Sequence, residues 1–188
     1  QKGTRARKMR IAGTPDRNWR PESVIYSGGA LEAPGETVSP GVLSGCGVPV
    51  EGSENSDPYR IGEDLEGRRL ALAKWIADPH NPLTTRVIVN RIWQHHFGKG
   101  LAGNPNNFGA KGSRPTHPAL LDWLASDFVE NGWTFKRMHR LIMTSRAYRQ
   151  AGHHREMKAL RGKDPNNELL AYFPPRRFTA EELRDTLL

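Results

Sequence analysis

One block of the chain, from Arg68 to Gln150, constrains the possible folds most, because four helical patterns alternate there with residues that end helices. A residue before proline is pushed out of the helical region, so the first pattern ends at Asp78, ahead of Pro79. The second ends at Gly98, since glycine readily adopts the left-handed conformation that closes a helix. The block therefore predicts a mainly α domain with short connections.

Apolar residues recur at helical spacing in each pattern and predict four helices. The first covers about 67–77, and the second runs from 83 or 84 to 98. The third begins after an N-cap at Thr116 and ends at 131, and the fourth begins at Thr134. The opposite face of the second helix carries a polar row at Arg86, Asn90 and Gln94. The expected apolar faces comprise Leu70, Ala73, Ile76 and Ala77; Val89, Trp93 and Phe97; Leu120, Leu121, Leu124 and Phe128; and Phe135, Met138 and Ile142.

The two ends of the chain show different patterns. Residues 23–26 predict a short strand, closed by Gly28 and Gly29. Near the other end, Thr179 to Glu182 forms a capping box that opens a last helix. We expect a basic arm or remnant of a preceding domain over 1–20, an extended, loop-rich segment over 21–67, and a helical domain over 68–188 that is truncated at its C-terminus. The fold class is mainly α, with four to five packed helices and a short extended or β N-terminal region.

The formal net charge of +8 is unevenly distributed along the sequence. Residues 1–20 contain seven Lys and Arg against one Asp, whereas residues 21–67 contain nine acidic residues against one Arg. Residues 134–163 are again basic, with nine Lys and Arg against one Glu. Solvated basic faces that pair in part with the acidic segment explain this pattern. Binding to an anionic polymer, such as nucleic acid, lipid headgroups or acidic glycan, is the alternative.

Cysteine content limits the chemistry of this segment. Cys46 is its one cysteine, which excludes an intramolecular disulfide, a multi-cysteine metal site and covalent c-type haem attachment within these residues. The sequence also lacks an apolar run near eighteen residues, so we predict no membrane span.

The segment Gly98 to Gly103 fits the glycine fingerprint of dinucleotide-binding sites literally. That fingerprint works between a strand and a helix, whereas this one follows a helix, so we interpret it as a helix stop and a turn. The wider loop from Gly98 to Thr116 carries Lys99, Lys111 and Arg114 among five glycines. Exposed backbone amides and basic side chains can hold an anion, so this loop is a candidate ligand site, with a plain long loop as the alternative.

Histidines and carboxylates do not combine into a complete catalytic or metal-binding set. His96 falls on an apolar row and His139 follows Phe135 by one turn, so we expect both rings to be packed and hydrogen-bonded, and we predict no metal site. No serine lies in a nucleophile elbow. The sequence therefore leaves catalytic residues unknown and the question of enzymatic activity open.

Arg86, Asn90 and Arg91 are the polar residues of greatest interest on the second helix. An Arg and Asn row on a helix that otherwise faces the core often satisfies loop carbonyls or a carboxylate. Direct recognition of an anionic ligand is the alternative, and with it these three residues join Lys99, Lys111 and Arg114 as candidate binding groups.

Several motifs together resemble a known family, domain of unknown function 1553, the C-terminal domain of large planctomycete proteins. They are Asn81-Pro82-Leu83-Thr84, Asn90-Arg91-Ile92-Trp93-Gln94-His95-His96-Phe97-Gly98, Asn107-Phe108-Gly109, Pro115-Thr116-His117-Pro118, Leu120-Leu121-Asp122-Trp123-Leu124, Gly132-Trp133, Tyr148-Arg149-Gln150 and Arg176-Arg177-Phe178-Thr179-Ala180-Glu181. Ser27-Gly28 departs from the family, which commonly has Arg-Gly there.

The resemblance implies a parent protein that is usually exported, to the periplasm or the cell exterior. It implies a preceding second domain of unknown function and often an N-terminal cytochrome-c-like domain, so that haem c would lie in a domain outside this segment and no cofactor within it. The favoured hypothesis is an accessory domain that docks the other domains of the same chain. The alternative is the binding part of an enzyme acting on anionic polysaccharide, its active site completed by a missing domain. Nucleic-acid binding is weaker, because the aromatics lie mostly on core faces.

Overall fold

The computed structural model describes residues 23–53, 56–62 and 67–188. The chain divides into two compact units, Gln1–Asp78 and Pro79–Leu188, and each is described by itself. The predicted basic arm at 1–20 lies outside the described residues. The predicted boundaries after residues 20 and 67 stay a prediction.

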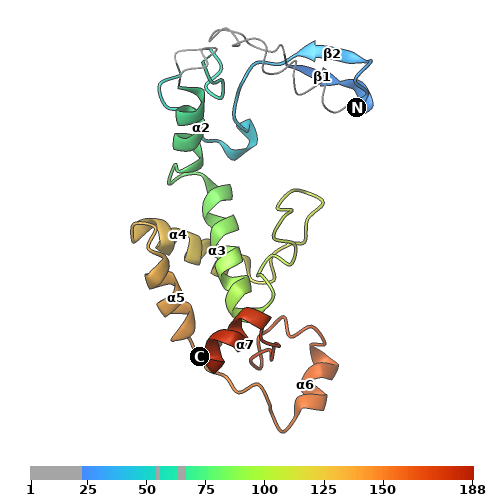
Figure 1. Ribbon diagram of the computed structural model, residues 1–188, viewed down its shortest axis with the longest axis vertical. Coiled ribbons are helices and arrows are strands. Elements are labelled where there is room, and N and C mark those ends of the chain that lie inside the picture. Colours follow the sequence, from blue (N-terminus) through green and yellow to red (C-terminus); the bar gives the residue numbers. More distant parts are fainter. Residues whose placement is uncertain (1–22, 54–55, 63–66) are drawn as a thin grey trace. The chain divides into compact units, whose positions relative to one another are not determined.

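A short antiparallel sheet opens the first unit (Figure 1). Strand β1 (Val24–Tyr26) pairs with β2 (Pro34–Thr37), with Val24 opposite Thr37 and Tyr26 opposite Pro34. The predicted strand at 23–26 is confirmed. Two short 3-10 turns follow β1 and β2, η1 (Ser27–Gly29) and η2 (Ser44–Cys46).

Helix α2 (Arg68–Ile76) ends the first unit and buries one aromatic side chain. The indole Nε1–H of Trp75 donates to the Val48 carbonyl at 2.9 Å. Val48 and neighbouring apolar residues are buried, whereas Leu70 and Ile76 are exposed. The predicted apolar face was therefore wrong. The segment around Val48 satisfies a large indole whose N–H needs an acceptor, and the aliphatic residues on the rest of the helix remain in solvent.

The second unit is mainly α, as predicted, and its core lies between three helices (Figure 1). They are α3 (Pro82–Phe97), α4 (Pro118–Glu130) and α5 (Phe135–Met143), followed by α6 (Met157–Lys163) and α7 (Ala180–Leu187). The core comprises Val89, Ile92, Trp93, Phe97, Leu101, Leu121, Leu124, Phe128, Met138 and Ile142. Each fully buried side chain of this kind contributes about 1.5–3 kcal/mol, which makes this cluster the main source of stability in the unit.

The predicted core positions on α3 and α4 are confirmed, except that Leu120 is only half-buried. On α5, Met138 and Ile142 are buried, whereas Phe135 is half-exposed although its ring lies edge-on to Phe128 at 5.3 Å.

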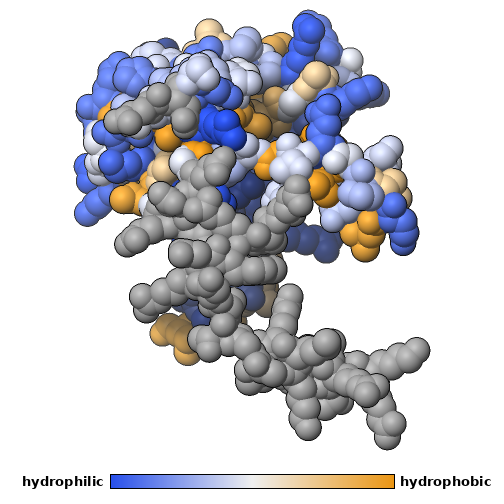
Figure 2. All heavy atoms as spheres, turned by 90° about the horizontal axis from the view of Figure 1, so that it is seen from above, coloured by the Kyte–Doolittle hydropathy of each residue, from blue (hydrophilic) through white to orange (hydrophobic). Residues whose placement is uncertain are grey.

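On the face seen in Figure 2, hydrophobic residues are dispersed among hydrophilic ones.

Local capping chemistry sets the helix ends. Asn81 caps α3 by accepting hydrogen bonds from the amides of Leu83 and Thr84, and Gly98 closes the helix at a φ of 79°. The N-cap of α4 is His117 rather than the predicted Thr116. Thr116 is held on the loop instead, where its N–H and hydroxyl both donate to the Leu101 carbonyl.

Candidate functional site

A side-chain amide on α3 fixes the loop that follows this helix. Asn90 is fully buried, and its Oδ1 accepts from the Ala102 N–H at 2.8 Å while its Nδ2–H donates to the Ala102 carbonyl at 3.1 Å. The amide thus pairs with the backbone as a neighbouring strand would. The prediction that the Arg and Asn row satisfies loop carbonyls is confirmed for Asn90, although its amide is fully buried instead of lying on an open polar face. Two buried backbone groups need partners, so the amide points inward.

The glycine motif after α3 serves this packing. A Cβ on Gly100 would lie 2.7 Å from the Ala102 carbonyl oxygen and 2.7 Å from Asn90 Nδ2. Glycine is required there for close approach and at Gly98 for its positive φ. The interpretation of the motif as a helix stop and turn is confirmed.

One side of the loop borders a groove of about 580 Å³ between the loop, α3 and α4. Arg86 and Asp122 lie on its wall, with Arg86 Nε 2.6 Å from Asp122 Oδ1. The two Nη groups of Arg86 make no further hydrogen bond to a described residue. Arg114 lines the same groove and is exposed, and it makes no ion pair with another described residue. The groove therefore presents unused guanidinium donors beside the half-buried ring of Phe108.

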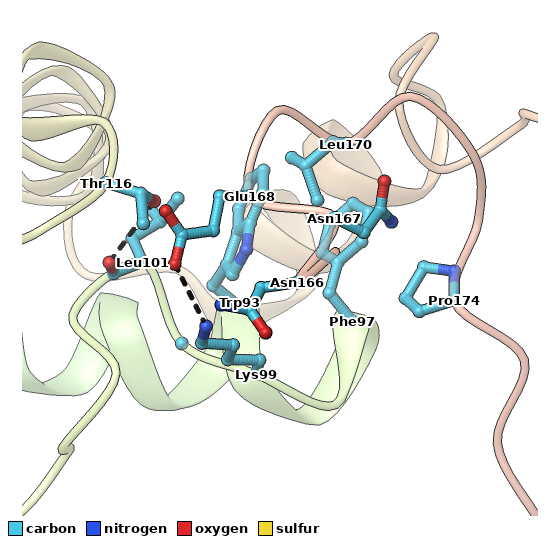
Figure 3. Close-up of a pocket in the computed structure, with 11 residues that line it drawn as sticks. Trp93, Phe97, Lys99, Leu101, Thr116, Asn166, Asn167, Glu168, Leu170 and Pro174 are labelled. Atoms are coloured by element: carbon cyan, nitrogen blue, oxygen red, sulfur yellow. Dashed lines mark hydrogen bonds and ion pairs between the residues drawn. The ribbon is translucent and has the colours of Figure 1, made fainter. Parts of the chain in front are cut away.

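A smaller cavity of about 60 Å³ lies between the start of the loop and residues 166–174 (Figure 3). Trp93, Phe97 and Leu101 form its apolar wall, and the rings of Trp93 and Phe97 stack at a centroid distance of 4.3 Å. Lys99 and Glu168 also line it, with Nζ and Oε1 3.5 Å apart. The cavity thus combines an apolar interior with a pair of opposite charges.

The turn beside this cavity is held by an unusual number of side-chain bonds. Asp164 accepts from the amides of Glu168 and Leu169 at 2.9 and 2.7 Å. Asn167 accepts from Ala171 N–H and donates to the Tyr172 carbonyl at 2.8 Å. The hydrogen bonds from the Leu169 amide and then the Glu168 amide lower the pKa of the Asp164 carboxyl.

These bonds hold two residues in the left-handed region, Asn167 at a φ of 49° and Leu170 at 54°. Leucine in this region is strained by about 1–3 kcal/mol and persists only where the surroundings over-determine it. Leu170 lines the cavity (Figure 3), so the strain positions a cavity wall.

The six predicted binding residues do not gather at one place. Arg86 and Arg114 line the groove, whereas Lys99 lines the small cavity. Arg91 is exposed and donates to Asn106 at 3.3 Å. Lys111 is exposed on the loop and has no ion pair with a described residue. The side-chain amide of Asn90 is hydrogen-bonded to the Ala102 backbone.

The two histidines expected to be packed do pack against each other. His96 Nε2 and His139 Nδ1 lie 2.8 Å apart, and the Tyr148 ring contacts His96 edge-on. Burial, then His139 and His95, lowers the pKa of His96. Within the described residues no three His, Cys, Asp or Glu are placed to hold a metal ion together.

Sequence reasoning missed the partners that lie far along the chain. Asp122 is 36 residues from Arg86, and Glu168 lies in a segment for which no helix or strand pattern was found. A usable signal was Asn167, because Asn tolerates the left-handed region and often marks a tight turn.

Within the described ranges, the helices lack the length and hydropathy that crossing a membrane requires. A family model described as PSD1, protein of unknown function (DUF1553), matches residues 68–188. No curated protein and no solved structure matches the chain.

Proposed function

The chain belongs to the PSD1 family of proteins of unknown function (DUF1553), and on that premise we propose that it is an accessory domain that docks other domains of a large exported protein. The observation that carries this proposal is the apolar stripe of α7. Leu183 and Leu187 lie one turn apart on this helix and are 50% and 86% exposed. An amphipathic helix gains stability by burying such a stripe, so a surface that covers it is expected.

The start of α7 is strongly specified, which argues that the helix is a built element. Thr179 accepts from the Glu182 amide, and the Glu182 carboxylate accepts from the Thr179 N–H and from both terminal nitrogens of Arg176. A capping box of this kind stabilises a helix N-terminus. A well-capped helix with an open apolar stripe suits recognition by a partner groove.

The proposed partners are the other domains of the same protein. They include the preceding domain of unknown function and a cytochrome-c-like domain, in which haem c would reside. Export to the periplasm or cell exterior is part of this proposal.

The proposal is tested by mixing this chain with the separately expressed preceding domain and measuring association by sedimentation velocity. Leu183→Lys places a charge on the stripe, and Asp185→Lys, on the opposite face of α7, is the matched control. We expect the first to abolish association and the second to preserve it. Equal association of wild type and Leu183→Lys would exclude α7 as the docking element.

A second function, the binding part of an enzyme acting on anionic polysaccharide, is favoured by the groove. Arg86 is oriented by Asp122 and keeps both Nη groups for a sulfate or carboxylate, and Arg114 adds a second guanidinium. The active site would be completed by another domain.

Binding to a sulfated and to an unsulfated glycan, each at two salt concentrations, tests this second function. Arg114→Ala should weaken binding to the sulfated glycan, whereas Arg140→Ala, an exposed arginine on α5, should not. Equal effects of the two substitutions would indicate nonspecific attraction by the basic surface. Tighter, salt-sensitive binding of a nucleic acid would instead favour the weakest of the three hypotheses.

A further inference from the structure

We propose that the small cavity beside Lys99 and Glu168 is a binding site for a free α-amino acid with a short aliphatic side chain. This inference is independent of docking through α7 and of anion binding in the groove. It rests on the cavity's size, its apolar wall, its opposite charges and the rigid turn that forms one side (Figure 3).

Size and lining define the part of the ligand that enters. The cavity measures about 60 Å³, and one water-sized atom needs roughly 15 Å³, so it holds about four heavy atoms. That is the size of a leucine side chain, and the smaller valine side chain also fits. Trp93, Phe97, Leu101, Leu170 and Pro174 supply the apolar contacts.

The opposite charges at the cavity mouth define the part of the ligand that stays outside the cavity. Lys99 Nζ and Glu168 Oε1 are 3.5 Å apart, and the two side chains are 52% and 47% exposed. An exposed pair of this length is weakly held, so a ligand can separate it easily. A ligand with a single charge would pair with one side chain and leave the other without its partner. A zwitterion replaces both partners, its carboxylate on Lys99 and its ammonium on Glu168.

The same mouth offers one more polar group and a fixed shape. The exposed side chain of Asn166 lines the cavity and makes no hydrogen bond to a described residue, so its amide can donate to the ligand carboxylate. Four hydrogen bonds between side chains and backbone groups hold the turn from Asp164 to Tyr172. This wall is therefore formed before the ligand arrives, which lowers the entropic cost of binding.

The experiment titrates the chain with L-leucine and follows the backbone amide resonances of residues 99–101 and 166–170 by NMR. We expect saturable shifts confined to these residues. N-acetyl-leucine, which keeps only the carboxylate, and leucine amide, which keeps only the ammonium, should each bind at least about tenfold more weakly. These two ligands also mimic the C-terminal and N-terminal residues of a peptide, so they separate a free amino acid from a chain end.

Variants test the assigned contacts. Lys99→Met and Glu168→Gln alter exposed side chains, and each should weaken leucine binding at least about tenfold, whereas Lys111→Met, on the same loop but outside the cavity lining, should leave it unchanged. Far-UV circular dichroism confirms that each variant is folded. The proposal is overturned by non-saturable shifts, by equal binding of N-acetyl-leucine or leucine amide, or by equal loss of affinity in Lys111→Met.

Discussion

Replacing Asn90 with Ala should destabilise the second unit more than any exposed substitution on the same helix. The amide satisfies both the N–H and the carbonyl of Ala102, which is 1% exposed. Leaving a buried polar group unpaired costs about 1–3 kcal/mol, so losing both partners should cost about 2–6 kcal/mol. At about 2–4 °C per kcal/mol, a loss of about 4 kcal/mol lowers the melting temperature by roughly 8–16 °C.

The assay is urea unfolding followed by circular dichroism, with Gln94→Ala as the control. Gln94 lies one turn further along α3 and is half-buried, and its side chain makes no hydrogen bond to a described residue, so its replacement should cost less than about 1 kcal/mol. A loss below about 1 kcal/mol in Asn90→Ala would refute the reasoning, since the two backbone groups would then have found other partners.

Gly100→Ala supplies a second test of the same contact. Its added Cβ would lie 2.7 Å from both Asn90 Nδ2 and the Ala102 oxygen. Truncating Asn90 relieves one of these clashes, so the double variant should lose less stability than the sum of the single variants. Strict additivity would show that Asn90 and Gly100 do not share the contact.

Three further predictions concern caps and titration. The lowered pKa of His96 means that the folded protein favours the neutral imidazole, so the free energy of unfolding falls as pH drops below the usual pKa of 6.5. His96→Gln should therefore show a shallower decline in thermal stability between about pH 8 and about pH 5. The Arg176 hydrogen bond, then the Thr179 amide, lowers the pKa of Glu182 to about 2 from 4.5. The stabilisation is complete above 4.5 and lost towards about 2, so the protection factors of the α7 amides against hydrogen exchange should fall over that window in wild type and not in Glu182→Gln. Asn81→Ala should lower the free energy of unfolding by about 0.5–2 kcal/mol in urea, and Asn81→Ser should restore part of it.

Sequence reasoning predicted the helical frame because its signals are local. Gly98 and the Thr179 capping box act within one turn, and Val89, Trp93 and Phe97 repeat at helical spacing. Helix α6 escaped notice because it is short and buries no residue, so no apolar stripe marks it.

The candidate sites were harder to predict, because they depend on contacts between distant segments. The polar row predicted that Asn90 satisfies a loop carbonyl, but only the path of the loop shows that the partner is Ala102. Lys99 was identified as a loop cation, but its pairing with Glu168 depends on the course of residues 164–174. Apolar periodicity reports which face of a helix is buried and carries no information about which loop meets it.

The loop after Gly98 is closed at its base, and this closure has a consequence for insertions at this position. Thr116 N–H bonds to the Leu101 carbonyl at 2.9 Å, next to the Asn90 clamp on Ala102. Residues 103–115 therefore form an excursion whose two ends stay joined. Because closure entropy grows only logarithmically, doubling the length of such a loop costs about 0.6 kcal/mol. Insertions within this excursion should therefore cost the unit little stability as long as Phe108, which packs against the core, is kept. This makes the loop a suitable place to graft a foreign peptide.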